Sequence, residues 1–122
     1  MKNRSGFTLI EILVVLGILG ITIPVFLTVS AYTRNMNYEA RMRTTATLLA
    51  EQKAEELVAE SASLRTRLQT ESLISGSGSE PPYTWESTAE MNDSLDQVEI
   101  IVWVRWRYNG KDRNVQVATY AR

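Results

Sequence analysis

The sequence contains no cysteine and no histidine. Disulfide bridges, thiolate nucleophiles, zinc sites built on thiolates or imidazoles, and catalytic triads that need histidine are therefore excluded. Neither sign of charge is in large excess, because the chain has 13 lysines and arginines and 14 aspartates and glutamates, for a formal net charge of -1. A nucleic-acid surface spread over the whole chain is thus not expected. With 122 residues, the chain has room for one small domain.

The N-terminal part contains a long apolar run from Phe7 to Ala31, in which Glu11 is the one ionisable residue. As an α-helix this run would extend roughly 37 Å, enough to cross a hydrocarbon core of about 30 Å. Lys2 and Arg4 precede the run, and basic flanks tend to stay in the cytoplasm. We therefore expect a single membrane span with a cytoplasmic N-terminus, although arginines beyond the run reduce the asymmetry.

Two other kinds of segment would have the same hydrophobicity, a cleavable signal peptide and a plain signal anchor. A signal peptide needs small residues at its cleavage site, and Thr28–Ala31 provides a weak one. Neither alternative explains Glu11, because a carboxylate in a spanning helix costs a few kcal/mol and is functional by default.

The segment Gly6-Phe7-Thr8-Leu9-Ile10-Glu11 resembles the processing site of type IV prepilins and of type II secretion pseudopilins. The resemblance implies that a membrane-embedded prepilin peptidase cuts after Gly6 and methylates the new N-terminus at Phe7. Glu11 would then occupy the fifth mature position, where the family has a glutamate. The resemblance further implies an inner-membrane subunit with a periplasmic head, which assembles into a filament with other pilins or pseudopilins on an inner-membrane platform.

The charge of Glu11 has a physical role in such an assembly. Cleavage creates a free ammonium at Phe7, and this cation of one subunit could pair with the Glu11 carboxylate of a neighbour displaced along the filament. Pairing would offset part of the desolvation cost in an apolar filament core. The alternative is a local interaction of Glu11 with its own N-terminus or with lipid headgroups.

Pro24 lies inside the apolar run and removes one helical hydrogen bond. We expect a kink or a local loss of helix over Gly20–Ile23. The resemblance to filament-forming pilins implies a segment that extends when the subunit leaves the bilayer, which makes Pro24 an assembly residue; a static kink is the alternative. Gly17 and Gly20 would allow close approach of neighbouring helices, but glycine is common in membrane helices.

The rest of the chain indicates a helix followed by a small antiparallel sheet. Helix-forming residues carry an apolar stripe through Ala59, and Leu64 and Leu68 would continue it as a further turn or a short separate helix. Glycine, serine and proline over 75–82 predict a loop. The stripe consists of Met42, Ala46, Leu49 and Leu57. The expected organisation is a leader over 1–6, a membrane and filament-core helix over 7–31, and a head over 32–122, with its amphipathic helix to about 60, a loop over about 61–82 and a sheet over about 83–121.

Strand signals are strongest near the C-terminus. From Val98 to Trp106 apolar residues alternate, Asn109-Gly110 is a favoured type I′ turn, and alternation resumes after it. Tyr83–Ser87 would be an earlier strand. The predicted fold class is therefore α+β, and a long N-terminal helix packed on a small antiparallel sheet is the general plan of the pilin fold.

Two surface features are candidate ligand sites. The acidic turn Glu90, Asn92, Asp93 and Asp96 offers oxygen atoms that could hold calcium, but it lacks EF-hand spacing, and a solvated turn without a cofactor is the preferred interpretation. The second is an aromatic and basic surface that could stack and hold single-stranded DNA, with a solvated strand face as the preferred interpretation. It comprises Trp103, Arg105, Arg107, Tyr108 and Arg113.

The leading hypothesis is accordingly a structural subunit and not an enzyme: a minor pseudopilin of type II secretion or a minor type IV pilin. The segment Thr47–Leu57 resembles the helix of the minor pseudopilin I and minor pilin V branches. The second hypothesis is an adhesin or DNA-uptake minor pilin whose head binds a ligand. A signal-anchored protein without an assembly role is the third, and it leaves Gly6 and Glu11 unexplained. The sequence does not decide between a secretion, pilus or competence system.

Overall fold

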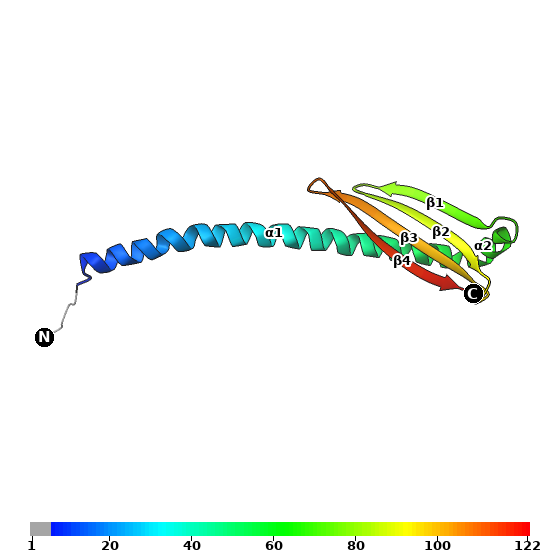
Figure 1. Cartoon of the computed structure of the whole chain (residues 1–122), viewed down its shortest axis with the longest axis horizontal. Coiled ribbons are helices and arrows are strands. Elements are labelled where there is room, and N and C mark those ends of the chain that lie inside the picture. Colours follow the sequence, from blue (N-terminus) through cyan, green and yellow to red (C-terminus); the bar gives the residue numbers. More distant parts are fainter. Residues whose placement is uncertain (1–5) are drawn as a thin grey trace. The chain divides into compact units, whose positions relative to one another are not determined.

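The structure is a computed structural model that describes residues 6–122. It is divided into two compact units, one that ends at Tyr38 and one that spans Glu39–Arg122. The first helix has residues in both units. In chain order the elements are α1 (Leu9–Ala59), α2 (Ser61–Leu68), β1 (Leu73–Glu80), β2 (Tyr83–Asn92), β3 (Gln97–Tyr108) and β4 (Lys111–Ala121), all labelled in Figure 1.

The first unit consists of the N-terminal part of α1. Its side chains are exposed almost throughout, from Leu9 to Val29, because no other element of the unit covers them. The helix runs without interruption past Pro24. The expected local loss of helix over Gly20–Ile23 is therefore not observed, since helical conformation continues on both sides of the proline.

The second unit is held together by one face of α1 and one face of a sheet. Met42, Ala46 and Leu49 of the predicted stripe are buried, and Leu57 packs against the same core from a half-buried position. Ala50 and Ala54 are also buried in this core. The predicted stripe is thus confirmed and is wider than expected.

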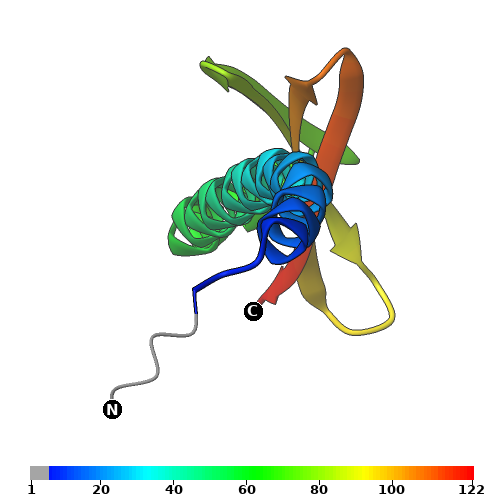
Figure 2. The same ribbon diagram turned by 90° about the vertical axis from the view of Figure 1, so that its left-hand side faces the viewer.

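The sheet is an antiparallel meander with the strand order β1-β2-β3-β4. The register places Ile74 opposite Ala89, Ala89 opposite Ile100, and Ile100 opposite Thr119, so one row of side chains crosses all four strands on the helix-facing side. Figures 1 and 2 show the four strands beside the last part of α1. The predicted α+β class, a long helix on a small antiparallel sheet, is confirmed.

Strand β3 supplies the centre of the core. The predicted alternation is confirmed, since Val98, Ile100, Val102 and Val104 are all at most 1% exposed, while the residues between them face the other side of the sheet. Burial of each of these four aliphatic side chains stabilises the head by about 1.5–3 kcal/mol.

The turn between β3 and β4 has the predicted conformation. Asn109 and Gly110 both have positive φ, 50° and 74°. Two successive positive φ angles define a type I′ turn, and asparagine followed by glycine tolerates them best. The predicted hairpin is confirmed, with β4 continuing to Ala121.

The prediction of a loop over 61–82 is wrong, because this segment contains a helix and a strand. Residues Ser61–Leu68 form α2, the short separate helix that the leucine spacing allowed, and Leu73–Glu80 form strand β1. The first predicted strand is also longer than expected, because β2 extends from Tyr83 to Asn92. Glycine disfavours a regular strand, but at Gly78 its small size is needed for packing.

The packing in question is that of Trp85 on β2 against β1. A Cβ atom at Gly78 would lie 2.7 Å from three atoms of the Trp85 indole, so only glycine leaves room for this ring. Lys53 Nζ lies 5.4 Å from the Trp85 ring centroid and 3.0 Å from Glu56 Oε2. The hydrogen bond between Lys53 and Glu56 raises the pKa of Lys53 and lowers the pKa of Glu56. The edge strand β1, whose sequence predicts a loop, is therefore held in place by an aromatic side chain of β2.

Candidate functional site

The predicted cleavage junction lies immediately before α1. Gly6 and Phe7 precede the helix, and Phe7 is 77% exposed. The carbonyl of Thr8 accepts hydrogen bonds from the backbone N–H of Glu11 at 3.1 Å and of Ile12 at 3.3 Å, which marks the start of the helix. The backbone between Gly6 and Phe7 is therefore outside the helical hydrogen-bond network and accessible to a peptidase. The remaining leader residues, including the basic ones, lie outside the described part of the chain.

The space around Gly6 is open. A Cβ atom added at Gly6 would meet no atom within 4 Å. Nothing in residues 6–122 thus requires glycine at this position for the fold. If a larger residue at Gly6 prevents cleavage, the steric restriction must come from the enzyme that binds the junction.

Glu11 lies in the first turn of α1. Its side chain is exposed, and within residues 6–122 it has no ion pair and no side-chain hydrogen bond. A carboxylate near a helix N-terminus interacts favourably with the helix dipole. That interaction is worth about 1 kcal/mol or less, which is smaller than the few kcal/mol cost of the charge in lipid. The single chain therefore leaves most of the cost of Glu11 uncompensated.

The surface that surrounds Glu11 is continuously apolar. By length and composition this helix could cross a membrane, and none of its most apolar stretch is buried within the chain. The polar hydroxyls on this stretch are satisfied within the helix: Thr22 donates to the Ile18 carbonyl at 3.1 Å, and Thr28 donates to the Pro24 carbonyl at 2.9 Å. Such internal bonds suit a helix in lipid, where no water is present to take them.

The predicted assembly residue Pro24 and two glycines, Gly17 and Gly20, lie on this exposed surface. Added Cβ atoms at Gly17 and Gly20 would meet nothing within 4 Å, so any close approach at these glycines must come from another molecule. Pro24 has no N–H to donate to the carbonyl one turn earlier. These positions are compatible with contacts between subunits, and their role in assembly stays a prediction.

The acidic turn between β2 and β3 does not gather its oxygen atoms around one point. The Asn92 side-chain oxygen accepts a hydrogen bond from the backbone N–H of Ser94 at 3.2 Å. Asp96 pairs instead with Arg65 of α2. Across the described residues, no group of three or more acidic side chains is close enough to hold a metal ion. Asn92 and Asp96 therefore each have a hydrogen-bond or ion-pair partner within the fold.

The predicted aromatic and basic surface is divided between the two faces of the sheet. Trp103, Arg105 and Arg107 alternate with the buried residues of β3 and so lie on the face away from the helix. Arg113 is opposite Trp106 in the register, on the helix side, and its Nη2 lies 2.8 Å from Glu39 Oε1. The five residues do not form one surface, because a strand sends alternate side chains to opposite faces.

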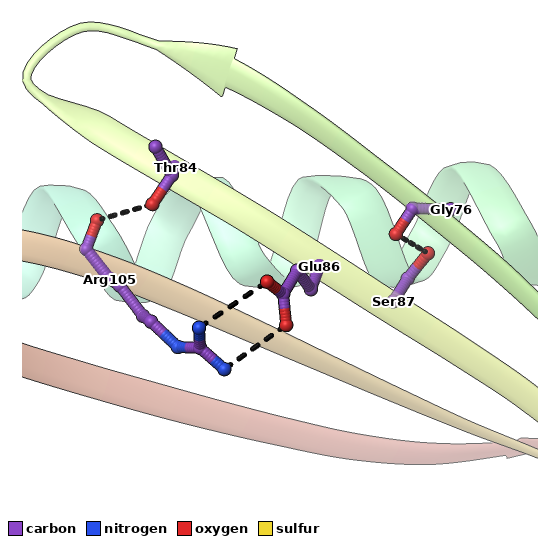
Figure 3. Close-up of polar contacts among 5 residues, drawn as sticks. All are labelled: Gly76, Thr84, Glu86, Ser87 and Arg105. Atoms are coloured by element: carbon purple, nitrogen blue, oxygen red, sulfur yellow. Dashed lines mark hydrogen bonds and ion pairs between the residues drawn. The ribbon is translucent and has the colours of Figure 1, made fainter.

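All three of these arginines have carboxylate partners. The Arg105 guanidinium donates two hydrogen bonds to Glu86, at 3.3 and 3.1 Å, as Figure 3 shows. Arg107 Nε lies 3.7 Å from Asp112 Oδ1. Each pair lies on the surface and contributes little stability. The pairing does, however, neutralise the cations on which phosphate binding would depend.

Comparison with known families bears on the N-terminal segment. Residues 1–23 match the model of the prokaryotic N-terminal methylation motif. No curated protein and no solved structure matches the chain. The motif covers Gly6, Phe7 and Glu11, the residues that carried the resemblance.

The motif and the fold together indicate a type IV pilin-like protein. Proteins with this motif are structural subunits and not enzymes; a prepilin peptidase processes them, and they assemble with other pilins. The long apolar helix is consistent with a membrane-anchored pilin.

Proposed function

We propose that the chain is a minor pseudopilin or minor type IV pilin of the inner membrane, cleaved between Gly6 and Phe7 and methylated at Phe7. The head projects into the periplasm, and the apolar part of α1 moves from the bilayer into the core of a short filament. The assembly platform of a secretion or pilus system would build this filament. Protein secretion or pilus biogenesis is the output that the subunit supports.

The observation that carries this proposal is an exposed apolar helix that contains one unpaired carboxylate. Nothing in residues 6–122 covers the helix from Leu9 to Val29, so lipid or other subunits must do so. Lipid alone leaves the Glu11 charge uncompensated. A neighbouring subunit with a free ammonium at Phe7 would supply the missing cation. The methylation motif supports the creation of that ammonium by cleavage.

Mapping the N-terminus of the mature protein tests the processing step. In cells that contain a prepilin peptidase, mass spectrometry should find a chain that begins at methylated Phe7 and lacks Lys2 and Arg4. Full-length protein that persists in such cells would contradict the proposal.

A matched pair of variants separates recognition from folding. Gly6→Leu should block cleavage although the structure has open space at this position, because the peptidase requires a close approach to the backbone. Gly17→Leu places the same side chain at another open glycine and should be cleaved normally. Cleavage of both variants would show that Gly6 is not the recognised residue.

The alternative of a head that recognises an adhesion ligand or DNA receives less support. Its candidate surface is split between two sheet faces, and Arg105, Arg107 and Arg113 are paired with carboxylates. We therefore assign the head to contacts with other subunits.

A further inference from the structure

A cavity of about 260 Å³ lies at the end of the head where α1 meets the β3–β4 hairpin. It is far larger than a single water requires. The residues that line it come from the first two turns of the head's helix and from the hairpin, and all belong to the Glu39–Arg122 unit. They are Glu39, Arg43, Trp106, Asp112, Arg113 and Asn114.

One lining residue has a buried donor without an acceptor. Trp106 is 5% exposed, and in the described part of the chain its Nε1 has no hydrogen-bond partner. The ring itself is fixed, because it packs edge-on against Tyr83 with centroids 6.1 Å apart. An unsatisfied buried N–H costs about 1–3 kcal/mol, so an acceptor within its reach would be favourable.

Among the charged residues that line the cavity, one cation has no carboxylate partner in the described part of the chain. Arg113 holds Glu39 at 2.8 Å, and Arg107, from outside the cavity, holds Asp112 at 3.7 Å. Both lining carboxylates are thus neutralised. Arg43 lies one helical turn after Glu39 and has no carboxylate partner among residues 6–122. A ligand for this cavity should therefore accept a hydrogen bond and carry negative charge.

We propose that this cavity binds a carboxylate, which pairs with the Arg43 guanidinium and accepts a hydrogen bond from the Trp106 indole N–H. The carboxylate is either a small free anion or an acidic side chain of another subunit. A planar carboxylate has enough acceptor positions for both donors, and charge-assisted bonds of this kind are the stronger ones. The site lies in the head and does not depend on cleavage at Gly6, so its failure would leave the proposed function untouched.

A neighbouring cavity could compete for the same indole. Trp106 and Asp112 also border a cavity of about 350 Å³ together with Arg105 and Arg107. Both of these arginines are already paired, with Glu86 and Asp112. The cavity that contains Arg43 is therefore the better anion site.

The test uses the full-length, ¹⁵N-labelled chain in detergent micelles and follows its three tryptophan indole N–H resonances by NMR. Trp106→Phe assigns the resonance of interest. Sodium acetate is then titrated against sodium chloride at equal ionic strength. We expect a saturable shift of the Trp106 resonance with acetate alone, while the resonances of Trp85 and Trp103 stay in place.

Variants locate the site. Arg43→Gln should weaken acetate binding about tenfold, as expected for the loss of one charge-assisted hydrogen bond. Arg41→Gln, on the same helix but outside the lining, should bind like the parent. Because Arg43 is exposed, its replacement should leave the fold intact, and the dispersion of the spectrum checks this.

Protein concentration distinguishes the two sources. A shift of the Trp106 resonance with rising protein concentration, without acetate, would identify a carboxylate of a second copy; independence of concentration together with acetate binding would identify a free anion. A resonance insensitive to both would mean that water alone satisfies the N–H, and the proposal would be overturned. An equal response to chloride, or an unchanged response in Arg43→Gln, would overturn it as well.

Discussion

Replacement of Glu11 separates processing from assembly. Cleavage requires recognition of the Gly6 junction, whereas pairing with the ammonium of Phe7 is needed only afterwards. Glu11→Leu removes an exposed, unpaired carboxylate from an apolar helix, so membrane insertion should be retained or improved by up to about 2.5–3.5 kcal/mol. In the filament the same change leaves a buried ammonium unpaired, which costs about 3–5 kcal/mol, or roughly 150-fold to 5000-fold in the assembly equilibrium.

The assay compares three chains in a strain that lacks the native copy. Parent, Glu11→Leu and Glu11→Asp are scored for cleavage by mass spectrometry, for co-purification with partner pilins, and for secretion or pilus output. Cleavage should be nearly equal in all three, while assembly should be lost in Glu11→Leu and intermediate in Glu11→Asp, which keeps the charge at shorter reach. If Glu11→Leu is cleaved, assembles and functions like the parent, the pairing mechanism is refuted for this subunit.

Three further predictions concern the head. Gly78→Ala should lower the free energy of unfolding by about 1–3 kcal/mol, because the new Cβ would lie 2.7 Å from the Trp85 indole, and Ser77→Ala on the exposed face is its control. Ile100→Ala empties a fully buried position and should cost about 2–5 kcal/mol in urea unfolding. A chain that begins near Tyr32 should be soluble and folded by circular dichroism, since it omits the apolar surface and keeps the whole core; an unfolded fragment would show that the core is insufficient.

The sequence predicted those parts of the head in which a repeating pattern is also a packing pattern. The alternation in β3, the Asn109-Gly110 turn and the helical stripe from Met42 are all present as expected. In each case a local rule and the tertiary structure demand the same residues, so local reasoning is sufficient.

Strand β1 shows where local reasoning fails. Glycine and serine over 75–80 indicate a loop, yet the segment pairs with β2 along its whole length. The reason is not local. Gly78 must be small because its position leaves room only for the Trp85 ring, and a turn separates these two residues in the sequence. A glycine followed within a few residues by a tryptophan is the sequence signal that could have indicated this pairing. The split of the aromatic and basic surface has a similar cause, since Arg113 faces Glu39 only after the hairpin has formed.

We expect the head to fold independently of the apolar helix. Its sheet is a meander of sequential neighbours, and its buried core lies entirely within Glu39–Arg122. Sequential pairing involves short loops and therefore low entropy costs of closure. The residues from Leu9 to Val29 contribute no buried side chain to that core. Under the proposed function, such a subunit would exchange lipid for the helices of its neighbours without disturbing the folded head.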